Sequence, residues 1–304
     1  MTADTALPPT GSIGDPSDAV DRRTKRTFGG IARIALNQGV IVLLLVLLLI
    51  LTLIPIVNML TMSLKDNGQI FARFWAMPNP YRWQNYRSGW EAMSQYILNS
   101  LVSSLTSVLG VAFLASISGY VFARHNFPGK EFLYLVILSL MMIPGMLTLI
   151  PSFVLVSDMG LVDTRWAMIL PWTSGGQVFA ILVCRGFFST LPEELFDAGR
   201  IDGCHEFHLY WRIAMPLSWP IMVTISIMHL VSTYNDFLWP LLVISSPEIQ
   251  VVSVGLREFT SQFGITDWGP RMAAYTVATV PLVLLFLFGM RYYIQGITSG
   301  AIKA

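Results

Sequence analysis

The stretch "VIVLLLVLLLILTLIPIVNML", residues 40–60, decides the fold class of this chain. Leucine, isoleucine and valine fill almost all of it, and it carries no charged residue. A helix of about 20 mainly apolar residues is long enough to cross the hydrocarbon core of a bilayer. We therefore expect a membrane-spanning helix here, with a surface that suits a lipid-facing position.

The composition of the whole chain also indicates a membrane protein. Of its 304 residues, 54% are hydrophobic and only 12% are charged, whereas an average soluble domain has about a quarter charged residues. This is too little charge to coat a globular surface, so we expect an integral membrane protein. The formal net charge of +1 gives no strong field for nucleic acid, and no nucleic-acid partner is expected. Cys184 and Cys204 form no CxxC pair and are expected to be unpaired structural thiols.

Five further segments are long and apolar enough to cross the membrane. With the first, they predict an all-α polytopic membrane protein with six transmembrane helices. The second to fifth contain Gly, Pro, Ser and Thr at levels typical of membrane helices that pack closely on other helices. These predicted spans are residues 97–122, 132–156, 167–188, 220–244 and 274–293.

The distribution of Lys and Arg predicts the orientation. Both ends of the chain and the segments near 124–130 and 185–219 carry more Lys and Arg than the loops near 61–96 and 245–273. Because cytoplasmic loops carry this excess, both termini are expected in the cytoplasm. The two larger loops then lie outside, and their Trp, Tyr and Phe residues suit interfacial anchoring or contact with an external protein.

The first 34 residues have a different composition. They are rich in Pro, Gly, Ser, Thr and Asp, and cannot bury enough apolar surface to become ordered. A secretory signal would place its apolar region near the N-terminus, before a small-residue cleavage site. We therefore expect a disordered cytoplasmic tail over residues 1–34, then an uncleaved first span that opens a domain over residues 35–304.

A charged segment, "STLPEELFDAGRIDGCHEFHLYWRIAMPLS" at residues 189–218, separates the fourth and fifth spans. Thr190 and Glu193 have the spacing of a capping box, and Pro192 fits the first turn of a helix. Gly203 suits a left-handed stop. A second helix should follow and lead to Pro216. The expected inner face of the first helix is Leu191, Leu195 and Ala198, and the apolar positions of the second are Phe207, Tyr210, Trp211 and Ile213.

Two interpretations of this segment remain open on physical grounds. It is either a capped amphipathic elbow lying on the membrane or a docking element for a soluble partner. Ala198, Gly199 and Gly203 would allow another surface to approach the backbone closely. Arg200 and Asp202 would then provide polar contacts at its edge.

The same segment resembles the EAA loop of ABC importer permeases. That loop has the pattern E-A-A-x-x-D-G-A, then a second short helix and apolar-x-x-Pro-Leu; here residues 197–204 read "DAGRIDGC" and residues 213–217 read "IAMPL". Asp197, Gly199 and Cys204 depart from the pattern. The "RIDG" form is similar to the maltose-permease type of sugar importer, as are "NSLVSS" at 99–104, "YNDFLWPL" at 234–241 and "YYIQGITSGAIKA" at 292–304.

The resemblance implies a type I ABC importer permease fold and a non-catalytic transport subunit in a bacterial or archaeal cytoplasmic membrane. Its implied partners are a second permease subunit, two ATP-binding cassette subunits and an extracellular or lipid-anchored binding protein that delivers a sugar. Residues 246–271 would contact the binding protein, and residues 298–304 would reach the ATPase. The implied ATPase-coupling residues are Glu193, Glu194, Asp197, Ala198, Gly199, Arg200, Asp202 and Gly203.

The chain itself shows no nucleotide or metal motif. A phosphate loop reads G-x-x-x-x-G-K-[ST], but before Gly129 and Lys130 the first glycine is replaced by Arg124, and Glu131 follows. We therefore expect no bound cofactor, with ATP and magnesium held by the partner ATPase. His205 and His208 have a possible ligand spacing, but no convincing further ligands complete a metal site. A lone His229 inside a span is expected to bond a neighbouring helix.

A substrate path is proposed near the outer end of the fifth span. Asp236 is the one acid at a span edge, and an intramembrane acid must face protein or water. Tyr234, Asn235 and Trp239 beside it combine polar and aromatic groups, as sugar pockets do. The alternative is a structural cap where this span bends at Pro240. In the fourth span, Gln177 would line the path or bond across helices.

Other function classes remain as alternatives. An ABC permease for another solute, such as glycerol phosphate or a polyamine, would carry the same charged segment. A secondary transporter would need several intramembrane ionisable groups and usually an internal repeat; only Asp236 and His229 qualify. A membrane-embedded enzyme would need clustered catalytic residues, and no such cluster is visible in the sequence.

Overall fold

The computed structural model describes the backbone of residues 16–262 and 267–301, and the side chains of 38–257 and 267–291. Every regular element in this part of the chain is a helix. The chain divides into two units, residues 1–58 and 59–304, and each is described by itself. This confirms the predicted all-helical class.

The first unit consists mainly of helix α1 (Pro16–Met62). Within its residues 38–62, an 18-residue stretch reaches a mean hydropathy of 3.5, and the side chains of 40–51 are exposed, as expected for a surface in contact with lipid. The structure continues the helix back to Pro16, where the sequence predicted a disordered tail over residues 1–34. Pro16 suits a first helical turn, and no proline interrupts the helix before Pro55. Residues 1–15 of the predicted tail lie outside the described residues.

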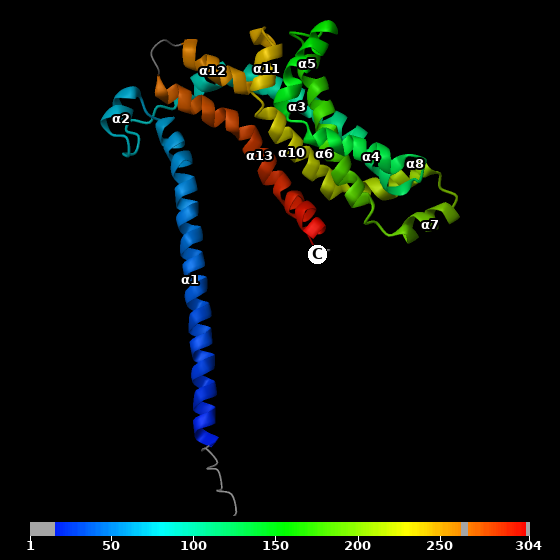
Figure 1. Cartoon of the computed structure of the whole chain (residues 1–304). Helices are drawn as coiled ribbons and strands as arrows, with labels where there is room; N and C mark the ends of the chain where they lie inside the picture. Colours follow the sequence, from blue (N-terminus) through cyan, green and yellow to red (C-terminus); the bar gives the residue numbers. More distant parts are fainter. Residues whose placement is uncertain (1–15, 263–266, 302–304) are drawn as a thin grey trace, which may run out of the picture. The chain divides into compact units, whose positions relative to one another are not determined.

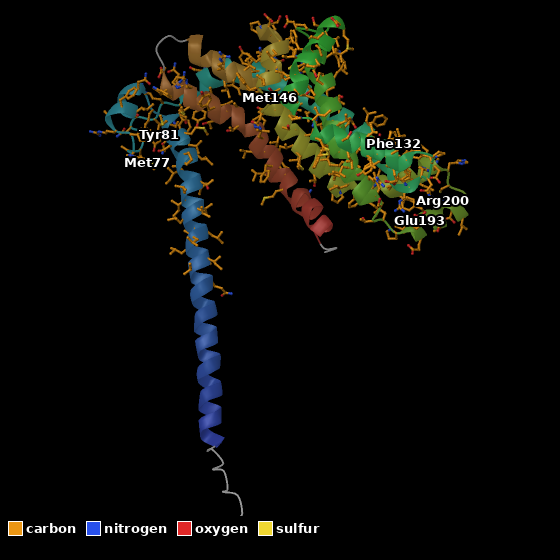
Figure 2. All side chains as sticks on the ribbon, viewed as in Figure 1. Met77, Tyr81, Phe132, Met146, Glu193 and Arg200 are labelled. Atoms are coloured by element: carbon orange, nitrogen blue, oxygen red, sulfur yellow. The ribbon has the colours of Figure 1, made fainter. Side chains whose placement is uncertain are left out.

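A compact loop joins α1 to α3 (Gln84–Arg124) and contains the short helix α2 (Asn67–Ala72). The Asp66 carboxylate caps α2 by accepting from the Gln69 amide at 2.9 Å, and it also pairs with Arg82 at 3.0 Å. The buried Lys65 ammonium donates to the Phe74 carbonyl at 2.7 Å. The loop nevertheless exposes large apolar side chains, and Met77 and Tyr81 mark it in Figure 2.

The second unit is built around α3, α6 (Trp166–Phe188), α10 (Trp219–Tyr234) and α13 (Trp268–Ala301), which lie alongside one another (Figure 1). Small residues lie where these helices cross. A Cβ atom at Gly119 would lie 2.4 Å from the Cys184 Cβ, and one at Gly110 would lie 2.8 Å from Thr173. Close backbone approach through small residues is the usual way in which membrane helices pack.

The predicted third span, residues 132–156, is not one straight helix. It comprises α4 (Lys130–Ser139), the 3₁₀ turn η1 (Leu140–Met142) and α5 (Gly145–Asp158), and the axis bends by 101°. Ile143 precedes Pro144 and has an extended backbone, since a residue before proline is disfavoured in the helical region. The bend corrects the prediction of an uninterrupted span.

The predicted fifth span, residues 220–244, is also interrupted. Helix α10 ends at Tyr234, residues 235–237 are non-helical, and α11 (Leu238–Val243) follows. The predicted bend at Pro240 is therefore wrong. Pro240 lies in the first turn of α11, where a missing N–H leaves no helical bond unmade.

Four described helices are each long and apolar enough to cross a membrane, and six spans result if each of two bent pairs counts as one. The second pair, residues 206–217 with α10, bends by 73°. The fourth predicted span, 167–188, coincides with α6, whereas α3 and α13 extend beyond the predicted second and sixth spans.

The loop between α5 and α6 is tied to the segment after α11. Asp163, at φ 61°, accepts hydrogen bonds from the Ser246 hydroxyl at 2.5 Å and from the amides of Ser246 and Ser245 at 2.8 and 2.9 Å. The 3₁₀ turn η3 (Pro247–Ile249) and α12 (Val252–Gln262) follow. These bonds, above all the one from the Ser246 hydroxyl, lower the pKa of the Asp163 carboxyl.

Replacing Gly119 by Ala tests the α3–α6 contact. The added methyl meets the Cys184 Cβ, which cannot rotate away, so we expect a loss of about 1–3 kcal/mol in the free energy of unfolding. Reversible unfolding in mixed detergent micelles measures it. The control is Gly186→Ala on α6, where no atom lies within 4 Å of the added Cβ. Equal stability of the two variants would contradict the close packing.

The Asp163 contacts predict a pH dependence. Because the pKa of Asp163 in the folded protein lies below its ordinary value of about 4, the carboxylate stabilises this loop fully above that value. The stabilisation is lost as the pH falls through the lowered pKa. Hydrogen exchange of the Ser245 and Ser246 amides, corrected for the intrinsic rate, should accelerate on acidification.

The variant Asp163→Asn should show the faster exchange already at neutral pH, since asparagine tolerates the left-handed backbone but carries no charge. The control Asp158→Asn alters an exposed acid at the end of α5 and should exchange like the wild type. Protection that is independent of pH in the wild type would rule out this role.

Candidate functional site

The charged segment 189–218, here called the elbow, lies between α6 and α10 (Figure 1). It contains α7 (Glu193–Ile201), a turn, and α8 (Glu206–Leu209), which continues as a π-helical turn (Tyr210–Ala214) and α9 (Met215–Leu217). The predicted order of short helix, turn and second helix is confirmed. The π-helical turn is an unpredicted feature.

The turn after α7 has the geometry of a Schellman motif. Gly203 has a φ of +79°, its amide donates to the Arg200 carbonyl at 3.0 Å, and the Cys204 amide donates to the Gly199 carbonyl at 2.9 Å. This backbone conformation favours glycine. The predicted left-handed stop at Gly203 is confirmed, and it fixes where α7 ends.

The predicted capping box at the start of α7 is wrong. The N-cap residue is Pro192, and the Thr190 hydroxyl donates back to the Phe187 carbonyl at 2.8 Å. Thr190 lies in the turn that follows α6, and its hydroxyl is engaged by the end of that helix instead of the first turn of α7. The Glu193 carboxylate instead accepts from Arg124 and Arg200.

The inner face of α7 also differs from the prediction. Phe196 and Gly199 are buried, whereas Leu195 is 43% exposed and Ala198 is exposed. The Phe196 ring lies 6.3 Å from that of Tyr120 on α3. A Cβ atom at Gly199 would lie 2.6 Å from the Leu209 side chain. Because Gly199 has no side chain, the second arm of the elbow, which begins with α8, can pack on the first arm, α7. The small size of Gly199 therefore serves a contact within this chain.

Arg200 holds the two arms of the elbow together. Its guanidinium donates to Glu193 at 3.1 Å, Asp197 at 2.9 Å and Glu206 of α8 at 3.3 Å. Hydrogen bonds to these carboxylates, that to Glu193 first, raise the pKa of Arg200. Glu193 and Arg200 come from opposite ends of α7 (Figure 2). Three of the predicted coupling residues are thus engaged within the elbow.

Of the five remaining predicted coupling residues, Gly199 is buried and the other four form an open surface. Glu194, Ala198, Asp202 and Gly203 are exposed, and among the described residues neither Glu194 nor Asp202 makes an ion pair. Ile201, which sequence reasoning missed as a site residue, is 86% exposed beside them. A single exposed isoleucine is common on protein surfaces, so this face is a candidate contact surface because Ile201 is grouped with the predicted coupling residues.

Arg124 is a second residue that the sequence did not reveal as part of the site. It ends α3, and its guanidinium donates to the Glu193 carboxylate and to the Leu191 carbonyl, each at 2.5 Å. It also lies 4.1 Å from the centre of the Phe196 ring. The sequence signal was a basic residue at the end of a long helix. Its partners could not be predicted from it, because they lie more than 60 positions further along the chain.

The residues predicted for a substrate path have mainly structural contacts. Asp236 accepts from the Trp172 indole at 2.7 Å and from the Trp239 amide at 3.4 Å, and its carbonyl accepts from the Ser253 hydroxyl at 2.6 Å. Asp236 therefore supplies hydrogen bonds at the break between α10 and α11. This agrees with the alternative prediction of a structural cap, although the break lies before Pro240.

The aromatic rings of this set are not open to a ligand. Trp239 is buried and donates to the Ala167 carbonyl at 2.9 Å, and the buried Tyr234 donates to the Ala278 carbonyl at 2.9 Å. Asn235 is exposed. Gln177 donates weakly to the Gly110 carbonyl at 3.4 Å on α3, which is the predicted bond across helices.

His229 makes the interhelical contact expected of it. Its Nε2 lies 2.8 Å from the Ser107 hydroxyl of α3, and Ser107 in turn accepts from Thr173 of α6 at 3.2 Å. A side chain at Gly176 would collide with the histidine ring. The polar side chains thus connect three helices of the second unit.

Comparisons with known proteins identify the family. The family described as "Binding-protein-dependent transport system inner membrane component" matches residues 112–299. The arabinooligosaccharides transport system permease protein AraQ of Halalkalibacterium halodurans is 34% identical over 205 residues, 67% of this chain and 72% of that protein. The probable ABC transporter permease protein YurM of Bacillus subtilis is 32% identical over 251 residues, 82% and 83% of the two chains.

The fold agrees with these relationships. A crystal structure of a bacterial ABC transporter involved in the import of the acidic polysaccharide alginate covers 89% of this chain and 98% of its own, with a TM-score of 0.75 and 18% identity. The chain therefore belongs to the family of binding-protein-dependent transport system inner membrane components, the permease subunits of ABC transporters, and has the type I ABC importer permease fold.

Proposed function

We propose that this chain is one transmembrane half of an ATP-driven oligosaccharide importer, and that the outer face of its elbow docks on a partner ATPase. The observation that carries the proposal is the exposed Ile201 on a helix whose end is fixed by the Gly203 turn. Glu194, Ala198 and Asp202 complete the proposed contact surface. ATP and magnesium would be bound by that partner.

The proposed topology has six spans: α1, α3, the bent pair of α4 and α5, α6, α10 with α11, and α13. An even number of spans places both termini on the same side, which the excess of Lys and Arg makes the cytoplasm. The elbow between the fourth and fifth spans then also faces the cytoplasm. Residues 298–304 are proposed to reach the ATPase, but the last three lie outside the described residues.

The proposed complex has a second permease subunit, two ATP-binding cassette subunits and an extracellular or lipid-anchored binding protein. Closure of the two ATPases on ATP would displace the elbow and change the permease pair from inward-open to outward-open. The binding protein would release its sugar into the outward-open state. Residues 246–271 are proposed to contact that protein; residues 263–266 of this segment lie outside the described part.

An oligosaccharide is the proposed substrate because AraQ is named for arabinooligosaccharides and the structural neighbour for alginate. Of the predicted path residues, Asn235 is the one whose side chain is exposed at the end of α10, and we propose it as a sugar contact. A solute such as glycerol phosphate is the alternative, and a self-contained secondary transporter is a further one.

Transport by the reconstituted complex tests the substrate class. Proteoliposomes that hold the co-expressed partners and internal ATP should accumulate at least one of a panel of labelled arabino- and alginate oligosaccharides. Glycerol 3-phosphate should not accumulate. Omission of the ATPase subunits should abolish uptake, whereas uptake driven by an ion gradient without them would establish the secondary-transporter alternative.

Substitutions on the outer face of α7 test the docking role. We expect Ile201→Asp, Asp202→Arg and Gly203→Asp to weaken co-purification of the ATPase by about tenfold or more, with this chain still in the membrane. Gly203→Asn is the matched control, because asparagine tolerates the left-handed backbone without adding charge. Wild-type co-purification and uptake in all three variants would exclude docking at this face.

A further inference from the structure

We infer that Arg124 is the positioning residue through which displacement of α7 reaches α3. The inference rests on the proposed docking of α7 but concerns a different step, the transfer of that motion into the membrane-spanning helices. Arg124 lies at the last position of α3, and its side chain is only 7% exposed.

Arg124 contacts the beginning of α7 in three ways. One nitrogen of its guanidinium donates to the Glu193 carboxylate, and the other donates to the Leu191 carbonyl just before the helix. The plane of the guanidinium covers the buried Phe196 ring at 4.1 Å. A planar fork that engages a carboxylate, a carbonyl and an aromatic face fixes both position and direction.

The far end of α7 is attached elsewhere. Arg200 links it to Glu206 of α8 at 3.3 Å, and Tyr120 of α3 also donates to Glu206 at 3.3 Å. The first turn of α7 is thus bound to the end of α3, and the last turn is bound to α8. A displacement of α7 therefore acts on α3 chiefly at Arg124, where the contact is direct, charged and nearly buried.

Helix α3 is placed to carry the displacement further. It packs on α6, α10 and α13, and its Ser107 lies 2.8 Å from His229 of α10 and 3.2 Å from Thr173 of α6. Its Asn99 accepts from Arg165 at 2.7 Å and donates to the Gln250 carbonyl at 2.9 Å in the loop after η3. One continuous helix thus connects the elbow with the opposite end of the bundle.

The test measures sugar uptake per ATP hydrolysed in the full reconstituted complex, with the oligosaccharide that gives uptake in the panel above. We expect Arg124→Gln to assemble and hydrolyse ATP, with uptake per ATP lowered by about tenfold. Arg124→Lys should recover part of this loss, because it keeps the charge but cannot bridge both acceptors.

The matched control is Arg185→Gln. Arg185 of α6 pairs with Glu131 of α4 at 2.7 Å and lies 3.7 Å from the Tyr134 ring centre. It repeats the ion pair and the aromatic contact of Arg124 without touching α7. Wild-type uptake per ATP is expected for this control. An equal loss in Arg185→Gln and Arg124→Gln would overturn the inference, because any disturbed arginine would then suffice.

Each remaining outcome is also decisive. Wild-type uptake per ATP in Arg124→Gln overturns the inference. If that variant fails to assemble, Arg124→Lys decides, since it keeps the buried charge but cannot bridge both acceptors. A lowered ratio in this variant supports the inference, and an unchanged ratio overturns it. Failure of the proposed function is seen separately, as an absence of ATP-dependent uptake by the wild type or as unchanged ATPase binding by the Ile201 and Asp202 variants.

Discussion

Inside hydrocarbon, a peptide group finds hydrogen-bond partners only within the protein, and the rest of this structure depends on that constraint. This constraint explains why the elements are helices. It also explains why side chains supply hydrogen bonds where a helix is interrupted. At the break after α10, Asp236 accepts from Trp172 and from the backbone of Trp239, and its carbonyl accepts from Ser253. The single acid near this span thus serves first to complete hydrogen bonds that the interrupted helix leaves unmade.

Charged side chains are costly in hydrocarbon, so the proposed topology places the charged elbow outside it. In the proposed mechanism the elbow must also be stiff. A loop joined to moving spans can transmit a displacement only if its own parts keep their relative positions. Arg200 joins the two arms through Glu193 and Glu206, and the absence of a side chain at Gly199 lets Leu209 pack against α7. These contacts leave Ile201 exposed, so the elbow has a rigid interior and an open outer face.

The parts of this fold that sequence could predict are those decided by local composition. The α6 bounds follow from apolar content alone, and the stop at Gly203 follows from a backbone conformation that glycine favours. The bend in the third span and the position of the break in the fifth were not predictable in this way, since proline is tolerated in many membrane helices. Likewise, Thr190 and Glu193 have capping-box spacing, but Arg124 competes for the carboxylate from 69 positions away.

The motif residues show why a pattern identifies a site without assigning roles inside it. All eight predicted coupling residues lie in one short stretch, yet Arg200 binds both Glu193 and Asp197, while Glu194 and Asp202 make no ion pair among the described residues. A residue that stabilises the elbow and a residue that meets a partner can be adjacent in sequence, because α7 turns about 100° per residue. Only contacts with α3 and α8 separate the two groups. In the proposed mechanism, those contacts make the inward-facing charges part of the path by which the outer face acts on the membrane helices.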